Sequence, residues 1–105
     1  MTKKLNQILD DQNIQYVNKT KNSYRKHDLA TKVMPGGNTR TTQWMEPYPF
    51  FAENAEGMYI NDIDGNHYLD FMLNATTLIL GHAHPDIVKT LTQQIQDGTV
   101  YSVPT

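Results

Sequence analysis

The chain has 105 residues, a mass of 12.0 kDa, 38% hydrophobic residues and a net charge of −2 at pH 7. This length allows one domain, which alone would bury only about 60–65% of its unfolded surface. The absence of cysteine excludes a disulfide framework, a thiolate zinc site and a cysteine nucleophile. No apolar run approaches the roughly 18 residues of a membrane span, and the first residues lack a signal-peptide core. We therefore expect a cytoplasmic protein with no membrane partner.

Charge divides the chain into a basic half and an acidic half. Residues 1–49 hold eight Lys or Arg against four Asp or Glu, whereas residues 50–105 hold one against seven. Basic arms that bind nucleic acid usually concentrate their charge in longer runs than Lys3-Lys4, the longest here. We interpret the basic residues as a solvated helix face and predict no nucleic-acid partner. An anion-binding or nucleic-acid-binding arm is the alternative.

Two helices are predicted in the basic half. Thr2 can cap the first of them. Its apolar face consists of Leu5, Ile8 and Leu9. Ser23 is the candidate cap of the second helix, which Pro35-Gly36-Gly37 must end. Short helices with so few apolar side chains need a surface to pack on.

A β-hairpin and a third helix are predicted in the acidic half. Strands at 58–63 and 67–72 flank the turn 64–66, where Gly and Asn tolerate positive φ, and 50–53 can add a third short strand. A helix begins at Pro85. Its apolar stripe consists of Ile87, Val88, Leu91 and Ile95. The predicted fold class is therefore an α+β segment: N-terminal helices, a small antiparallel sheet and one further helix.

Two polar clusters could carry metal or acid–base chemistry, and for both we favour a structural interpretation. His82-Ala83-His84 and Asp86 lie close in sequence, but alternate residues of an extended segment point to opposite sides, and zinc ligands must converge. Asp62, Asp64 and Asp70 lack the spacing of a calcium-binding loop, and Asp is a common turn residue. We predict neither a metal site nor a catalytic residue in the chain.

A glycine-rich loop follows the second predicted helix. The sequence Pro35-Gly36-Gly37-Asn38-Thr39-Arg40 lacks the Lys-Ser/Thr and the preceding strand of a phosphate-binding P-loop. It presents Arg40, whose planar guanidinium, on a loop rimmed by Trp44 and Tyr48, suits bidentate recognition of a carboxylate. On the residues alone, however, we favour the interpretation of Arg40 as an ordinary surface arginine.

Three blocks of sequence occur in a distinctive order: MPGG at 34–37, EGMYINDIDGNHYLDF at 56–71 and LGHAHP at 80–85. Together they resemble the amino-terminal segment of class III pyridoxal-phosphate enzymes, the family of glutamate-1-semialdehyde aminomutase and its related aminotransferases. The resemblance extends over roughly residues 20–105. It implies that the α+β segment belongs to a larger α/β fold, the PLP-dependent transferase fold of type I.

The resemblance also implies an organisation for the chain. Residues 1–34 would be a helical arm, residues 35–49 a substrate-side loop, and residues 50–105 a small sheet with a helix, without the large cofactor domain. The implied cofactor is pyridoxal 5'-phosphate, but the family's Schiff-base lysine and its other anchoring residues lie outside this chain. The chain alone is therefore expected to be inactive, and the full-length enzyme to be a homodimer.

The site residues implied by the resemblance follow from where the chain departs from the aminomutases. Those enzymes usually carry Pro-Gly-Gly-Val-Asn-Ser-Pro-Val-Arg and a later Ser-Trp-Gly, whereas this chain has Asn-Thr-Arg and Asn74-Ala75-Thr76. It is more similar to the branch of β-amino-acid aminotransferases, in which this arginine binds the substrate carboxylate. The implied substrate-binding residues are Arg40, Asn74, Ala75 and Thr76, with Trp44 and Tyr48 lining the pocket. A truncated, non-catalytic binding or dimerisation module is the alternative.

Overall fold

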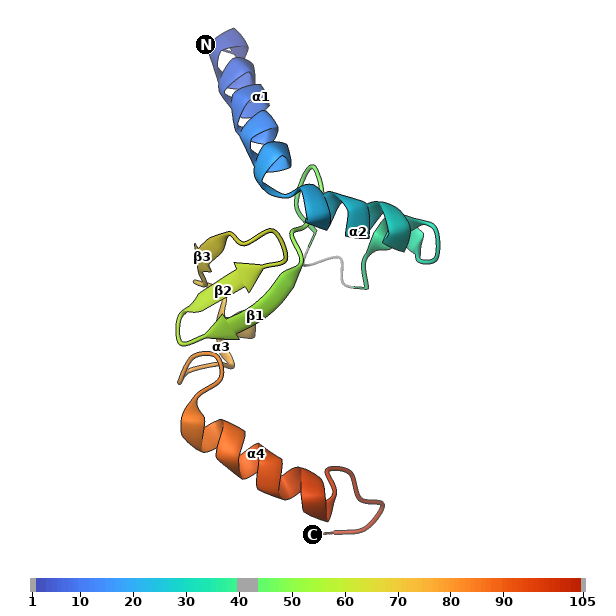
Figure 1. Cartoon of the computed structure of the whole chain (residues 1–105), viewed down its shortest axis with the longest axis vertical. Coiled ribbons are helices and arrows are strands. Elements are labelled where there is room, and N and C mark those ends of the chain that lie inside the picture. The colour runs from blue at the N-terminus through green and yellow to red at the C-terminus, as the bar shows by residue number, and fades with distance from the viewer. Residues whose placement is uncertain (1, 40–43, 105) are drawn as a thin grey trace. The chain divides into compact units, whose positions relative to one another are not determined.

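The computed structural model describes residues 2–39 and 44–104. In chain order the elements are α1 (Thr2–Lys19), α2 (Lys21–Thr31), the 3-10 turn η1 (Pro35–Gly37), β1 (Ala52–Glu56), β2 (Tyr59–Asp62), β3 (His67–Leu69), α3 (Leu73–Thr76) and α4 (Pro85–Asp97) (Figure 1). This confirms the predicted α+β segment. The chain forms two compact units. One comprises residues up to Asn54 together with Asn61–Tyr68, and the other comprises Ala55–Ile60 together with the residues from Leu69 onward.

The three strands form an antiparallel sheet in the order β1-β2-β3, and each strand gives residues to both units. In the turn between β2 and β3, the backbone N–H of Asp62 donates to the carbonyl of Asn66 at 3.0 Å, and Gly65 has φ +83°. The predicted hairpin is thus confirmed. The additional short strand predicted at 50–53 is β1, which begins two residues later than predicted, at Ala52. Phe50 instead stacks its ring on Tyr68 with centroids 4.5 Å apart.

Helix α2 begins two residues before Ser23, so the prediction that Ser23 caps it is wrong. Thr20 at the cap position makes no capping hydrogen bond. The carboxylate of Asp64, in the turn after β2, accepts hydrogen bonds from the backbone N–H groups of Asn22 (2.6 Å) and Ser23 (2.9 Å). The hydroxyl of Ser23 donates to the same carboxylate at 2.7 Å. The first-turn amides of α2 are therefore capped by a residue 41 positions away in sequence.

Tyr48 is the buried centre of the first unit, with 3% of its surface exposed. Its ring centroid lies 5.4 Å from those of Tyr16 and Tyr24, and its hydroxyl lies 3.0 Å from Thr20 Oγ1. The Tyr16 hydroxyl donates to the Tyr48 carbonyl at 2.8 Å. Burial, reinforced by nearby acidic groups, raises the pKa of Tyr16 to about 12. Among the described residues, Tyr48 is the only buried hydrophobic side chain, so the core of this unit is small.

Asp62, which is fully buried, orders the turn between β2 and β3. One carboxylate oxygen accepts from the backbone N–H groups of Asp64 and Asn66, at 2.9 and 2.8 Å. The other accepts from the side-chain amide of Asn66 and from the Tyr68 hydroxyl, both at 2.9 Å. Burial and the hydrogen bond to Asp62 raise the pKa of Tyr68. These contacts give Asp62 the structural role that its place beside a turn predicted.

Helix α4 lies in the second unit and begins at Pro85, as predicted. It ends at Asp97, after which Gly98 adopts φ +101°. The exposed fractions of its apolar stripe run from 47% to 65% for Ile87, Val88, Leu91 and Ile95. The stripe is thus largely open to solvent in the part of the chain that the structure describes. Over that same part of the chain, no helix has the length and apolar character needed to cross a membrane.

Candidate substrate-side site

The residues predicted to bind substrate fall in three places. Arg40 lies outside the described residues. Trp44 and Tyr48 belong to the first unit, and Asn74-Ala75-Thr76 belongs to the second.

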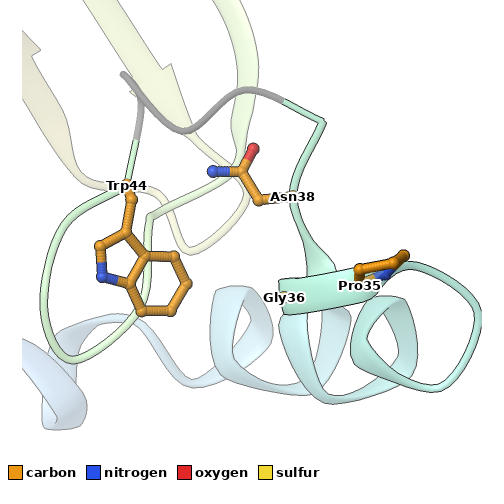
Figure 2. Close-up of a pocket in the computed structure, with 4 residues that line it drawn as sticks. All are labelled: Pro35, Gly36, Asn38 and Trp44. Atoms are coloured by element: carbon orange, nitrogen blue, oxygen red, sulfur yellow. The ribbon is translucent and has the colours of Figure 1, made fainter.

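Trp44 lines a pocket of about 380 Å³ together with Pro35, Gly36 and Asn38. Figure 2 shows its indole ring facing the gap below Asn38, with Pro35 and Gly36 on the other side of that gap. The indole Nε1–H donates to the Glu46 carboxylate at 3.1 Å, and this hydrogen bond holds the edge of the ring that carries Nε1. The pocket has an aromatic wall beside the turn Pro35–Gly37.

The turn Pro35–Gly37 is held against α2, although its composition suggested a flexible loop. The backbone N–H of Gly37 donates to the Met34 carbonyl at 3.0 Å. Gly37 has φ +62°, and a Cβ atom there would lie 2.8 Å from the Thr31 methyl and 3.0 Å from the His27 ring. Only glycine permits this close approach without displacing a neighbour. The beginning of the predicted substrate-side loop is therefore fixed in place.

Tyr48 lies in the buried centre of the unit and is not among the residues that line the pocket. Its link to the pocket passes through His27, which stacks on Tyr48 with centroids 6.1 Å apart. The same imidazole lies 5.5 Å from the Trp44 ring. Tyr48 is therefore linked to the pocket only indirectly, through the His27 ring that packs on Trp44.

The predicted segment Asn74-Ala75-Thr76 lies in α3, a single left-handed turn. Leu73, Asn74, Ala75 and Thr76 have φ values of 44°, 50°, 57° and 69°. Each non-glycine residue in this conformation costs roughly 1–2 kcal/mol, and such strain persists only where surrounding contacts impose it. Strained segments of this kind concentrate at functional sites. Sequence reasoning placed these residues at the site but did not predict the turn, because no glycine marks it.

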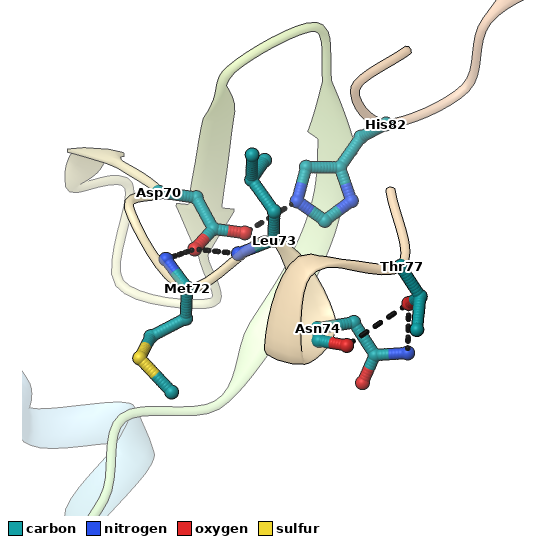
Figure 3. Close-up of polar contacts among 6 residues, drawn as sticks. All are labelled: Asp70, Met72, Leu73, Asn74, Thr77 and His82. Atoms are coloured by element: carbon teal, nitrogen blue, oxygen red, sulfur yellow. Dashed lines mark hydrogen bonds and ion pairs between the residues drawn. The ribbon is translucent and has the colours of Figure 1, made fainter. Parts of the chain in front are cut away.

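The Asp70 carboxylate binds the backbone amides at the start of this turn (Figure 3). One carboxylate oxygen accepts from the backbone N–H groups of Met72 at 2.8 Å and Leu73 at 3.0 Å. The other lies 2.7 Å from Nε2 of His82. The hydrogen bond from His82, assisted by the two backbone N–H groups, holds the pKa of Asp70 below its usual range despite burial. The side chains of Asp70 and His82 are only 7% and 18% exposed, so the pair is largely shielded from water.

His82 is fixed in turn by Gly57, in the connection between β1 and β2. Its backbone N–H donates to the Gly57 carbonyl at 2.7 Å, and the Gly57 N–H donates back to the His82 carbonyl at 2.9 Å. Gly81 has φ +80°, and a Cβ atom there would lie 2.6 Å from the Gly57 oxygen. The glycine of the Leu80-Gly81-His82 block is therefore required by close backbone approach. Within the described ranges, no cluster of three or more His, Cys, Asp or Glu side chains is placed to hold a metal ion.

This sequence and fold define the chain as a member of the class-III aminotransferase family, whose sequence model matches residues 41–105. The chain resembles glutamate-1-semialdehyde 2,1-aminomutase of Methanocella arvoryzae (38% identity over 82% of this chain and 20% of that protein). It also resembles the enzyme of the same name from Methanobrevibacter smithii (45% identity over 72% of this chain and 18% of that protein). The chain thus spans about a fifth of the length of the curated relatives it matches.

Solved structures agree with this assignment. An omega-transaminase from Sphaerobacter thermophilus superposes with a TM-score of 0.75 and 44% identity over 79% of this chain and 19% of its own. A β-phenylalanine aminotransferase from Variovorax paradoxus gives 0.83 and 28% over 93% of this chain and 24% of its own. A glutamate-1-semialdehyde aminomutase from Pseudomonas aeruginosa PAO1 covers the whole chain at 0.89, with 21% identity, which shows the shared fold. The predicted family and fold are confirmed.

The pocket formed by the described residues has neither a lysine nor an acidic side chain among its lining residues. Lys4, Lys19, Lys21, Lys26, Lys32 and Lys89 are all exposed. That the residues anchoring pyridoxal 5'-phosphate lie outside this chain stays a prediction from the resemblance.

Proposed function

We propose that this segment recognises the substrate carboxylate in a pyridoxal-phosphate-dependent aminotransferase or aminomutase that acts on an amino acid or a related amino-carboxylate. One observation carries the proposal. The relatives that share the segment include enzymes named glutamate-1-semialdehyde 2,1-aminomutase and β-phenylalanine aminotransferase, and both names denote substrates with an amino group and a carboxylate. The cofactor and its anchoring residues belong to the remainder of the fold, and the full-length enzyme is a homodimer in this proposal.

Arg40 is the proposed carboxylate ligand. Its guanidinium presents a planar fork of N–H donors that matches both oxygens of a carboxylate. The fixed turn Pro35–Gly37 precedes it, and the Trp44 wall follows four residues later, where an indole can exclude water from the bound substrate. Holding the carboxylate would orient the amino carbon for reaction, and binding energy would be used for orientation.

Asn74, Ala75 and Thr76 are the proposed second set of substrate contacts. All three side chains are exposed in the described residues, so they are available to a ligand. Their left-handed backbone is strained, which supports a role at a site where geometry must be fixed. Residues 1–34 then serve as a helical arm, 35–49 as the substrate-side loop, and 50–105 as the sheet and helix that carry the second contacts.

Replacing Arg40 tests the proposal in the full-length protein that carries this segment. Arg40→Ala is expected to lower kcat/KM for carboxylate substrates about 10–100-fold, the effect of losing a charge-assisted bidentate contact. Arg40→Lys, which keeps the charge but loses the planar fork, should fall between the alanine variant and the wild type. Arg25→Ala removes an exposed arginine of α2 and is the matched control. An unchanged kcat/KM for every carboxylate substrate would contradict the proposed role of Arg40.

A further inference from the structure

We propose that Asp70 and His82 are a positioning pair, which sets the left-handed conformation of Leu73–Thr76 and through it the affinity for the substrate. The inference rests on the proposed function, because it takes Asn74, Ala75 and Thr76 as substrate contacts. Neither Asp70 nor His82 touches the substrate in this account. Their effect is transmitted through the backbone of the turn.

The Asp70 carboxylate binds the backbone where the left-handed stretch begins. Its Oδ1 accepts from Met72 N–H at 2.8 Å and from Leu73 N–H, the first left-handed residue, at 3.0 Å (Figure 3). These two bonds determine the direction in which the chain enters the turn. Because the side chain is 7% exposed, water competes little for the same amides. A left-handed turn without glycine needs such imposed contacts to persist.

Both members of the pair are anchored to one neighbouring segment, Gly57-Met58. The backbone N–H of Asp70 donates to the Met58 carbonyl at 2.8 Å. His82 exchanges two backbone hydrogen bonds with Gly57, at 2.7 and 2.9 Å. The Oδ2 to Nε2 contact of 2.7 Å therefore closes a ring of hydrogen bonds between two fixed points. A carboxylate held in this way has little freedom to release the turn.

This pair differs from an ordinary surface ion pair. Lys32, the residue after α2, and Asp28 within α2 also form a contact of 2.8 Å, but their side chains are 62% and 51% exposed. Such a pair contributes little. Asp70 and His82 instead join a shielded charge to the backbone next to the predicted substrate contacts. The Lys32–Asp28 pair thus provides a matched control.

The test uses the full-length protein that carries this segment and the variants Asp70→Asn, His82→Ala and His82→Gln. Hydrogen exchange of the peptide covering residues 70–78 reports the turn, and kcat and KM for a carboxylate substrate report the site. For Asp70→Asn and His82→Ala we expect exchange and KM each to rise about tenfold, with a smaller change in kcat. His82→Gln, which keeps an N–H donor, should recover most of the loss. Asp28→Asn should change neither readout.

The outcomes separate this inference from the function on which it rests. Unchanged exchange in Asp70→Asn and His82→Ala would overturn the inference, whatever the kinetics. Faster exchange with an unchanged KM would also overturn it, because the pair would then be structural only. Failure of the proposed carboxylate recognition is seen separately, in an Arg40→Ala variant that retains its kcat/KM.

Discussion

Three aspartates of the acidic half hold turns by accepting several hydrogen bonds each. Asp62 accepts four, and Asp64 and Asp70 accept three each. An ionised carboxylate has about four lone-pair sites, so one side chain can satisfy several amides at once. Three of the seven acidic residues in this half of the chain therefore fix the backbone.

The pH dependence of stability follows from these contacts. Burial opposes ionisation of Asp64, but the hydrogen bonds from Asn22 and Ser23 outweigh it and lower its pKa. A depressed carboxyl pKa contributes stability that is present above the ordinary value of about 3.9 and is lost as pH falls through the lowered value. We expect the free energy of unfolding of the full-length protein to decrease as the pH falls below about 4.

Asp64→Asn should make that acid-dependent loss shallower, because the amide does not titrate. Asp28→Asn, at an exposed position of α2, is the control and should leave the slope unchanged. Denaturant titrations at several pH values measure both slopes. Equal slopes in Asp64→Asn and the wild type would contradict the assignment of the cap to Asp64.

Local sequence predicted some residue roles and missed others. Asp64 was assigned to a turn from its neighbours, which is where it lies, but its capping of α2 depends on a contact across 41 residues. Ser23 has the side chain of a helix cap, yet it lies inside the first turn. A propensity describes what a side chain can do locally, and tertiary contacts decide which option is used. The assignments of Arg40, Asn74, Ala75 and Thr76 stay predictions.

At the scale of elements, hydrophobic periodicity predicted α1, α4 and the hairpin, because each has a regular pattern bounded by capping or turn residues. The left-handed turn α3 was not predictable in this way. Its sequence, Leu-Asn-Ala-Thr, contains no glycine, and its conformation is tied to Asp70, His82 and the backbone of Gly57. Elements imposed by distant partners leave little local signal.

Two glycines with nearly equal φ allow a matched test of the close approach between the backbones of Gly81 and Gly57. Gly81 (φ +80°) lies against the Gly57 backbone, whereas a Cβ atom on Gly65 (φ +83°) would meet no described atom within 4 Å. Gly65→Ala should cost about 1–2 kcal/mol of unfolding free energy, from the left-handed backbone alone. Gly81→Ala should cost about 1–3 kcal/mol more, because the methyl group overlaps the Gly57 carbonyl. Equal losses in chemical denaturation would contradict the close approach.

At the scale of the molecule, the described residues have far more apolar surface than core. The large hydrophobic side chains of α1 and α4 are mostly exposed, and Tyr48 alone among the described hydrophobic residues is buried. The sequence predicted this shortage from its length and from the few apolar residues on each helix. The curated relatives are roughly four times as long as this chain, and we propose that the rest of the class-III fold covers these apolar faces.

The isolated 105-residue chain is therefore expected to lack a single cooperative unfolding transition. It should melt gradually and bind a hydrophobic dye strongly, because its apolar helix faces lie open to solvent. It should also show no transaminase activity, since the resemblance implies that the Schiff-base lysine lies outside this chain. Calorimetry and dye fluorescence check the first expectation. A sharp transition without dye binding would show that the chain is a self-sufficient module.

The most direct test of the central claim is the native mass of the material that contains residues 1–105 in its source cells, captured with an antibody against this segment. The account predicts a particle several times heavier than 12.0 kDa, in which the segment is accompanied by the rest of the class-III fold and by pyridoxal 5'-phosphate. A free 12.0 kDa chain without cofactor or companion would contradict a role in substrate recognition for an aminotransferase or aminomutase.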